Sequence, residues 1–151
     1  MRPFRPFQRQ SQRERSGAAT VETALVLPVF FMVMLGIVEC GRAFMISQLL
    51  TNAAREGGRI AVMNGSSNTE VELTIEDIAQ RTAGIAPADL DITLNVHEHA
   101  GNPSASNEVA NARKRDLCEV IVRVNYDKVN LLPIRYLTGA QLVGQAAMRH
   151  E

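Results

Sequence analysis

The sequence has 151 residues with 16 basic and 16 acidic side chains, so its formal net charge is zero. This length suffices for one modest domain and a membrane segment. The first 17 positions contain five of the basic residues and only one of the acidic residues. The remainder of the chain therefore carries a net charge of −4. An acidic body excludes nucleic-acid binding by the main domain, which would need a basic face.

An apolar run without charges, ALVLPVFFMVMLGIV, follows the basic N-terminus and covers residues 24–38. Extended back to Ala18 it covers about 21 residues, or about 31 Å of helix, which matches the hydrocarbon thickness of a bilayer. Basic residues on one flank favour a cytoplasmic location for that flank. We therefore predict a basic cytoplasmic leader at 1–17, a transmembrane helix at 18–40 and a C-terminal domain outside the membrane.

Three other interpretations of the apolar run remain open. A core helix of a soluble protein would normally keep a polar stripe, which this run lacks. A cleaved signal peptide would need a site such as Gly41-Arg42-Ala43, which is a weak small-x-small pattern. A lipoprotein would use Cys40, but Glu39 stands directly before it, where a small residue is expected.

The helix is predicted to continue beyond the membrane as an amphipathic segment at 41–63. Apolar residues recur there at helical spacing. The stripe consists of Met45, Leu49, Ala53, Ile60 and Met63, widened by Leu50 and Ala54. Pro28 is expected to kink the membrane half, and Gly57-Gly58 is expected to bend or fray the outer half.

The remaining residues, 64–151, are predicted to form a small extracytoplasmic α+β domain. A helix capped by Thr69 or Asn68 is expected to reach about Ala83. Alternating polarity predicts strands at 91–97, 116–126 and 141–149, the second with its apolar face on Cys118, Val120, Val122, Val124 and Tyr126. The expected fold class is α+β: the long N-terminal helix packs on a small antiparallel sheet with one further helix.

The sequence lacks common catalytic motifs, such as Gly-x-Ser-x-Gly, Gly-x-x-x-x-Gly-Lys and Cys-x-x-Cys. We expect no enzymatic activity, no cofactor and no small-molecule substrate. His97 and His99 could share a metal with Glu98 or His150, although such a pair more often lies at a wet strand end, and we predict no metal site. A disulfide between Cys40 and Cys118 stays open, since it requires Cα atoms less than about 7 Å apart.

The candidate site lies directly before the apolar run. Gly17 ends the basic stretch, and Glu22 follows five residues later at the edge of the predicted span. A carboxylate there is either a wet interfacial acid or a functional group, because burying it unpaired is costly. The functional interpretation is that a peptidase cuts after Gly17, and the new amine of Ala18 pairs with Glu22 of a neighbouring subunit.

This pattern resembles the leader of type IV pilin-like proteins, and within that group the TadE-like family of tight-adherence pilus assembly proteins. The resemblance covers about residues 16–60. It is carried by residues 17–28 (GAATVETALVLP), by Gly36, Glu39, Gly41 and Arg42, and by residues 51–59 (TNAAREGGR). Two positions depart from the pattern: Thr23 stands where the group often has Tyr, and Ala18 is a small first mature residue.

The resemblance implies a non-enzymatic minor pilin or pseudopilin of a tight-adherence pilus assembly or secretion system in the bacterial inner membrane. The implied partners are membrane lipid, a prepilin peptidase acting at Gly17 and Ala18, other pilin-like subunits that meet Glu22, and polytopic assembly-platform proteins. The alternative is a membrane-anchored periplasmic binding or adaptor module unrelated to pili. Processing after Gly17 separates the two hypotheses, since a plain anchor keeps its arginines.

Overall fold

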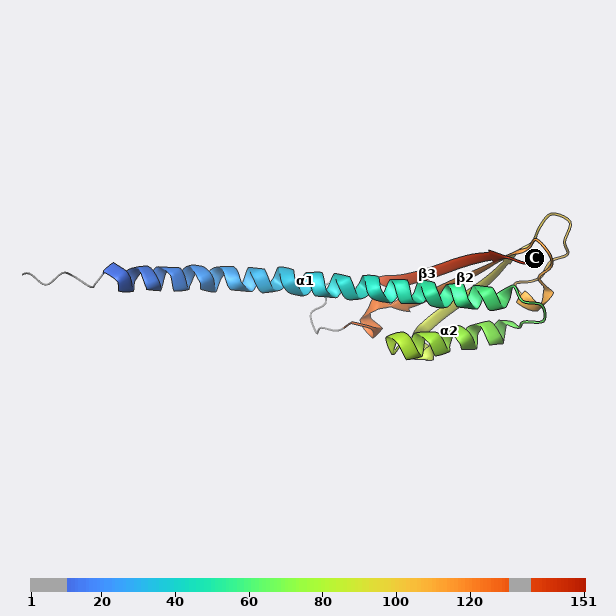
Figure 1. Ribbon diagram of the computed structural model, residues 1–151, viewed down its shortest axis with the longest axis horizontal. Coiled ribbons are helices and arrows are strands. Elements are labelled where there is room, and N and C mark those ends of the chain that lie inside the picture. The colour runs from blue at the N-terminus through green and yellow to red at the C-terminus, as the bar shows by residue number, and fades with distance from the viewer. Residues whose placement is uncertain (1–10, 131–136) are drawn as a thin grey trace, which may run out of the picture. The chain divides into compact units, whose positions relative to one another are not determined.

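The computed structural model describes residues 11–130 and 137–151, with side chains from Gly17 onward. Two helices precede three strands (Figure 1). They are α1 (Ser11–Ala61), α2 (Asn68–Ala83), β1 (Leu90–His97), β2 (Leu117–Asn125) and β3 (Gln141–Arg149), with short 3-10 turns η1 (Pro87–Asp89), η2 (Val109–Asn111) and η3 (Tyr126–Lys128). This arrangement confirms the predicted α+β class. The chain divides into two compact units, Met1–Val38 and Glu39–Glu151.

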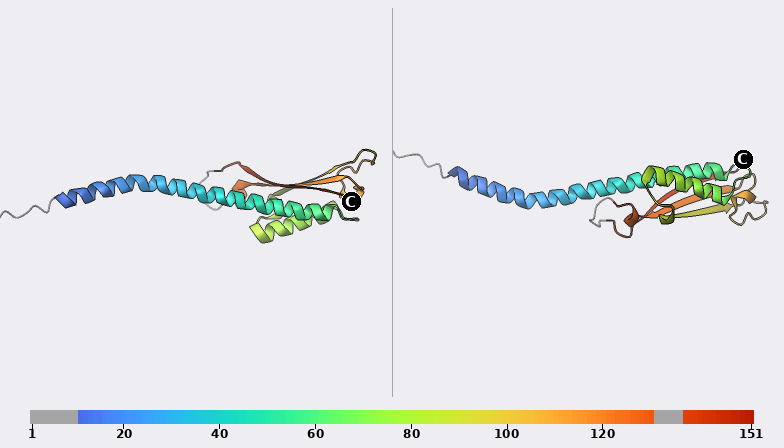
Figure 2. Two further views of the ribbon diagram at one scale, coloured as in Figure 1. Left: turned by 45° about the horizontal axis from the view of Figure 1, so that its top comes forward. Right: turned by 90° about the horizontal axis from the view of Figure 1, so that it is seen from below.

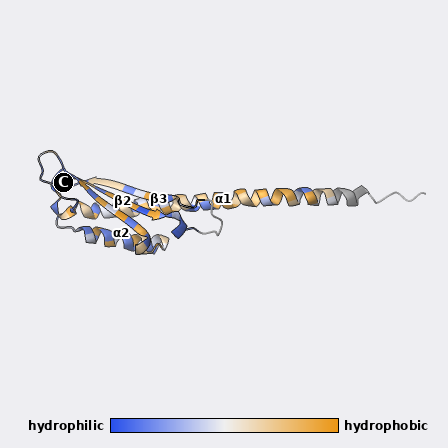
Figure 3. Cartoon of the chain, turned by 180° about the vertical axis from the view of Figure 1, so that it is seen from behind, coloured by the Kyte–Doolittle hydropathy of each residue, from blue (hydrophilic) through white to orange (hydrophobic). Residues whose placement is uncertain are grey.

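The first unit contributes the N-terminal part of α1. Its large apolar side chains from Val21 to Val38 are at least 43% exposed, apart from Leu35, which is partly buried. Figure 3 colours most of this part of the helix as hydrophobic. α1 begins at Ser11 rather than at the predicted Ala18, because the Gln-, Arg- and Glu-rich residues before Gly17 are good helix formers. The helix continues through Pro28. The first ten residues of the predicted leader lie outside the described residues.

The second unit contains an antiparallel sheet in the order β1-β2-β3 (Figures 1 and 2). Its register pairs His97 with Leu117 and Leu117 with Arg149, so β1 and β3 end beside the start of β2. The central strand buries alternate residues, as expected where one face of a sheet is covered. The predicted apolar face is confirmed: Cys118, Val120, Val122, Val124 and Tyr126 are all buried.

The outer half of α1 packs on this sheet through a face that matches the predicted stripe in part. Ile46 and Leu50 are fully buried, with Ala53, Ala54 and Ala61 on the same face. Met45 and Met63 were expected to face the core but are 50% and 62% exposed. The prediction is therefore confirmed at Leu50, Ala53 and Ala54 and wrong at Met45 and Met63. It also left out two buried residues, Ile46 and Ala61.

Glycines show how close that approach is. At Gly144 of β3, an added Cβ would overlap the backbone of Leu50 and Thr51. At Gly57 of α1, it would lie 2.6 Å from the Cδ1 atom of Ile75 in α2. Gly57 and Gly58 were expected to bend or fray the helix; instead both are buried inside α1, which ends at Ala61 rather than Met63.

α2 begins with Ser67 as its N-cap, whose hydroxyl accepts a hydrogen bond from the Glu70 amide at 3.3 Å. The predicted caps, Thr69 and Asn68, were therefore wrong. Asn68 instead holds a distant loop, since its side chain donates to the carbonyl of Asn107 and accepts from the amide of Val109. Val71, Ile75 and Ala79 form the buried face of α2. Both helices therefore cover the buried face of the sheet (Figure 2).

Candidate functional site: the N-terminal part of α1

The predicted processing residues lie within α1 rather than in an extended segment. Gly17 and Ala18 are exposed, and both belong to the helix that begins at Ser11. A peptidase that reads an extended backbone must therefore first unwind the first turns of α1. Glycine lowers helix stability by about 1 kcal/mol relative to alanine, and helix ends open with little free energy, so Gly17 stands where unwinding costs least.

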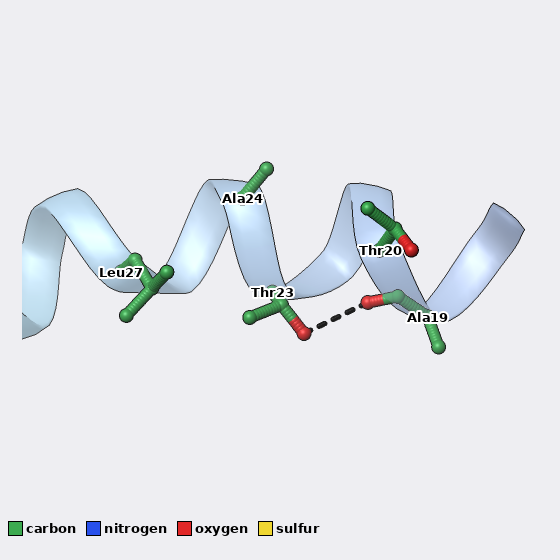
Figure 4. Close-up of a pocket in the computed structure, with 5 residues that line it drawn as sticks. All are labelled: Ala19, Thr20, Thr23, Ala24 and Leu27. Atoms are coloured by element: carbon green, nitrogen blue, oxygen red, sulfur yellow. Dashed lines mark hydrogen bonds between the residues drawn. The ribbon is translucent and has the colours of Figure 1, made fainter. Parts of the chain in front are cut away.

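Small residues line a shallow depression on this part of α1, formed by Ala19, Thr20, Thr23, Ala24 and Leu27 (Figure 4). The Thr23 hydroxyl donates to the carbonyl of Ala19 at 2.8 Å, within the helix. Because this hydroxyl is bonded to its own backbone, Thr23 presents its methyl side to the surroundings at no hydrogen-bonding cost. In a bilayer, small residues one turn apart allow two helices to approach closely.

Glu22 borders this small-residue face. A second depression is lined by Glu22, Thr23, Val26, Leu27 and Phe30, and Thr23 and Leu27 take part in both. The Glu22 side chain is exposed and forms no ion pair with any residue whose side chain the structure describes. A carboxylate beside a helix-packing face, at the edge of an apolar span, can meet a cation of a neighbouring chain.

A buried acid that the sequence analysis did not single out as a site lies where the second unit begins. Glu39 is completely buried, and neither of its carboxylate oxygens has a hydrogen-bond partner among the described residues. The Tyr126 hydroxyl donates to the Glu39 carbonyl at 3.2 Å. Burial, followed by the contact with Glu39, raises the pKa of Tyr126 to about 12. Its position in the family-like pattern (Gly36, Glu39, Gly41, Arg42) was the signal that could have identified it.

The neighbouring Arg42 fixes the chain that follows β2. Its Nε donates to the carbonyl of Val129 at 2.7 Å. Together with the Tyr126 hydrogen bond, this contact attaches η3 and Val129 to α1. The resemblance-bearing residues Glu39 and Arg42 therefore act in the second unit as attachment points between α1 and the end of β2.

The other candidates from the sequence do not assemble into a site. Cys40 and Cys118 are both free thiols, so the disulfide does not form. The Cys118 thiol donates to the Ala61 carbonyl, which is 21 residues, or about 31 Å of helix, beyond Cys40. His97 contacts Glu119 at 3.2 Å, whereas His99 bonds to the carbonyl of Ala100. Hydrogen bonds from His97 and Asn95 lower the pKa of Glu119.

These features define a class of protein: a small α+β domain carried by one helix that is long and apolar enough to cross a membrane. The family model described as TadE-like protein matches residues 17–59, so the predicted resemblance is confirmed for this segment of the chain. The match begins at Gly17 and includes Ala18, Glu22, Glu39 and Arg42. No curated protein and no solved structure matches the chain.

Proposed function

We propose that this protein is a non-enzymatic minor pilin, or pseudopilin, of a tight-adherence pilus assembly system, anchored in the bacterial inner membrane by α1. The observation that carries the proposal is the coincidence of two findings in one segment. Residues 17–59 match the TadE-like family, and within them the large apolar side chains from Val21 to Val38, apart from Leu35, are exposed. An apolar surface this large on one helix requires lipid or other apolar helices around it.

The topology follows from charge. The arginines before Gly17 favour a cytoplasmic N-terminus, which places the second unit in the periplasm. A reporter that is active only outside the cytoplasm should therefore work when fused after Glu151. Activity of a strictly cytoplasmic reporter at the same position would contradict this orientation.

Glu22 is the proposed contact with other pilin-like subunits, and the small-residue face beside it gives their helices room to approach. Cutting after Gly17 creates an amine on Ala18 that can pair with the Glu22 carboxylate of a neighbour. An ion pair at low dielectric constant is stronger than one in water, and removing one partner leaves the other charge uncompensated. Prepilin peptidase and polytopic platform proteins are the further partners of this proposal.

The processing step is tested by the intact mass of the membrane-extracted protein, with and without prepilin peptidase. The expected result is the loss of residues 1–17 only when the peptidase is present. Gly17→Glu should block this loss, and Gly36→Ala is the matched control, since Gly36 also lies in α1 with open space at its Cβ. An unchanged mass with and without the peptidase would show that the leader is retained and that no free amine forms on Ala18.

The role of Glu22 is tested by cross-linking to pilin-like partners. Glu22→Ala should leave the protein inserted and processed but reduce its cross-linking yield. Gly17→Glu should give the same defect by a different route, so the two changes should not be additive when combined. Fully additive losses of cross-linking yield, or a normal yield from Glu22→Ala, would show that Glu22 is a hydrated acid at the membrane interface with no role in subunit contact.

A further inference from the structure

Three consecutive basic residues, Arg113, Lys114 and Arg115, lie exposed in the loop before β2. The sheet register places this loop at the end of the unit where β1 and β3 finish, beside Arg149. We call these four residues the basic tip. Within the described residues, none of the four forms an ion pair. The acidic residues nearest to them in sequence are the buried Asp116 and the exposed Glu151.

Hydrogen bonds to the backbone hold the basic tip in one conformation. The Arg113 amide donates to Asp116 Oδ2 at 2.7 Å, and the Lys114 carbonyl accepts from Asn102 at 3.0 Å. The Arg115 amide donates to the carbonyl of His150 at 2.8 Å, with Arg115 at a φ of 77°. Every residue of the triplet is therefore fixed through its backbone while its charged end stays exposed, which reduces the entropy lost when it binds an anionic surface.

An acidic groove lies elsewhere on the same unit, between α2 and the start of β1. It is lined by Glu72, Glu76, Leu90, Asp91 and Ile92. In the described part of the chain, Glu72 and Glu76 form no ion pair, and Asp91 lies 3.7 Å from Arg123. The two glutamates are four residues apart on α2, so they share one face of the helix.

The basic tip and the acidic groove are not joined within one molecule. In the part of the chain that the structure describes, no ion pair connects any of the four basic residues to Glu72, Glu76 or Asp91. Asp91 lies near the first residue of β1 and His97 is its last, and six residues of strand extend over about 20 Å. In this fold, an ion pair between the two surfaces would therefore join two molecules.

We propose that the basic tip of one copy docks into the acidic groove of a second copy. Each copy offers both surfaces, so the contact is head-to-tail and leaves one free surface at each end of a pair. Such a contact builds open chains rather than closed dimers unless its rotation closes a ring. The inference deepens the proposed assembly role by naming a second copy as a partner, and it rests on that role for its biological meaning.

The experiment measures co-purification of two differently tagged copies of the full chain in detergent. Arg113→Glu with Arg115→Glu should reduce the co-purified yield at least tenfold, and so should Glu72→Lys with Glu76→Lys. The matched control is Arg55→Glu with Arg59→Glu, which reverses two exposed arginines on α1 and should leave the yield unchanged. Raising the salt concentration from 0.05 to about 0.5 M should weaken the wild-type association, because exposed charges are screened.

Reversing the charges on both surfaces together decides whether the reduced co-purification comes from loss of this contact or from another cause. A chain carrying all four reversals should associate with itself again, since its tip is acidic and its groove basic. A mixture of the two defective variants should also associate, because one supplies an intact groove and the other an intact tip. Labelling of the buried Cys118 thiol verifies folding, since it should stay unreactive in every variant.

Continued dissociation of the four-reversal chain with Cys118 protected would overturn the proposal. A tip reversal that leaves self-association intact but abolishes retention on an anionic polysaccharide would overturn it too, and would assign the basic tip to that polymer. Neither result depends on cleavage after Gly17 or on Glu22, so failure of this contact and failure of the proposed function are distinguishable.

Discussion

Gly144→Ala is expected to be the most damaging single-methyl change in the second unit. The new Cβ would overlap the Leu50 carbonyl carbon and the Thr51 nitrogen and lie 2.6 Å from the Leu50 oxygen. These are backbone atoms of α1, so no side chain can rotate away. Bringing the nearest of these atoms, the Leu50 carbonyl carbon, to ordinary contact, which begins at 3.4 Å, requires α1 and β3 to separate by about 1.1 Å at this point.

Overpacking of this kind costs about 1–3 kcal/mol, and separation also loosens the contacts of Ile46 and Leu50. We expect a loss of about 3 kcal/mol in the free energy of unfolding, which corresponds to about 10–20 °C in Tm for a domain of this size. Gly58→Ala is the matched control. Its Cβ would meet the Met148 side chain at 3.6 Å, an ordinary contact, and alanine favours the helix by about 1 kcal/mol.

The assay is pulsed thiol labelling of the full chain in detergent during a urea titration, in a Cys40→Ser background. Cys118 is buried between β2 and α1, so its reactivity reports the separation of helix and sheet. The expected order of midpoints is Gly58→Ala at or above the parent and Gly144→Ala well below it. Equal midpoints for Gly144→Ala and the parent would refute the close approach of α1 to β3.

Four further substitutions test other parts of the structure. Leu50→Asp should destabilise the second unit by several kcal/mol because it buries a charge, whereas Leu49→Asp, at a half-buried position, should cost less; the same labelling assay compares them. Burial alone would raise the pKa of Asp116, but hydrogen bonds from His99, Arg113 and Asn102 outweigh it and lower the pKa. A lowered folded-state pKa gives stability above the unfolded value near 3.8 that is lost as the pH falls through the folded value. Asp116→Asn should therefore unfold more easily at neutral pH and show a flatter acid dependence; an unchanged midpoint at pH 7 would contradict this role. Glu39→Gln keeps the shape of the buried side chain and replaces a carboxyl group whose oxygens have no hydrogen-bond partner among the described residues, so Tm should stay equal or rise, and a large fall would show that the carboxyl group has a partner.

Local patterns in the sequence predicted most of the second unit. The alternation along β2 and the boundaries of β3 follow from polarity with a period of two, and the structure agrees with both. α2 was also predicted, but its cap was assigned to Thr69 or Asn68, because several capping residues stand together in Ser67-Asn68-Thr69 and only the backbone geometry selects one of them.

The packed face of α1 could be predicted only in part from hydrophobicity, at Leu50, Ala53 and Ala54. Leu49 and Leu50 are equally apolar, and the contact that places Leu50 in the core is with Gly144, almost a hundred residues later in the chain. The same holds for Glu39, whose burial depends on the second unit folding around α1. By contrast, Gly17, Ala18 and Glu22 form a sequence pattern on one helix, so the candidate site could be predicted without tertiary contacts.

The most direct test of the central claim is pilus formation in the native host after deletion of the gene. The account predicts that the deletion removes or sharply reduces surface pili. The parent protein should restore them, and Glu22→Ala should fail to do so although it reaches the membrane in equal amount. Normal pilus numbers in the deletion strain would contradict an assembly role and would favour the plain membrane-anchored adaptor.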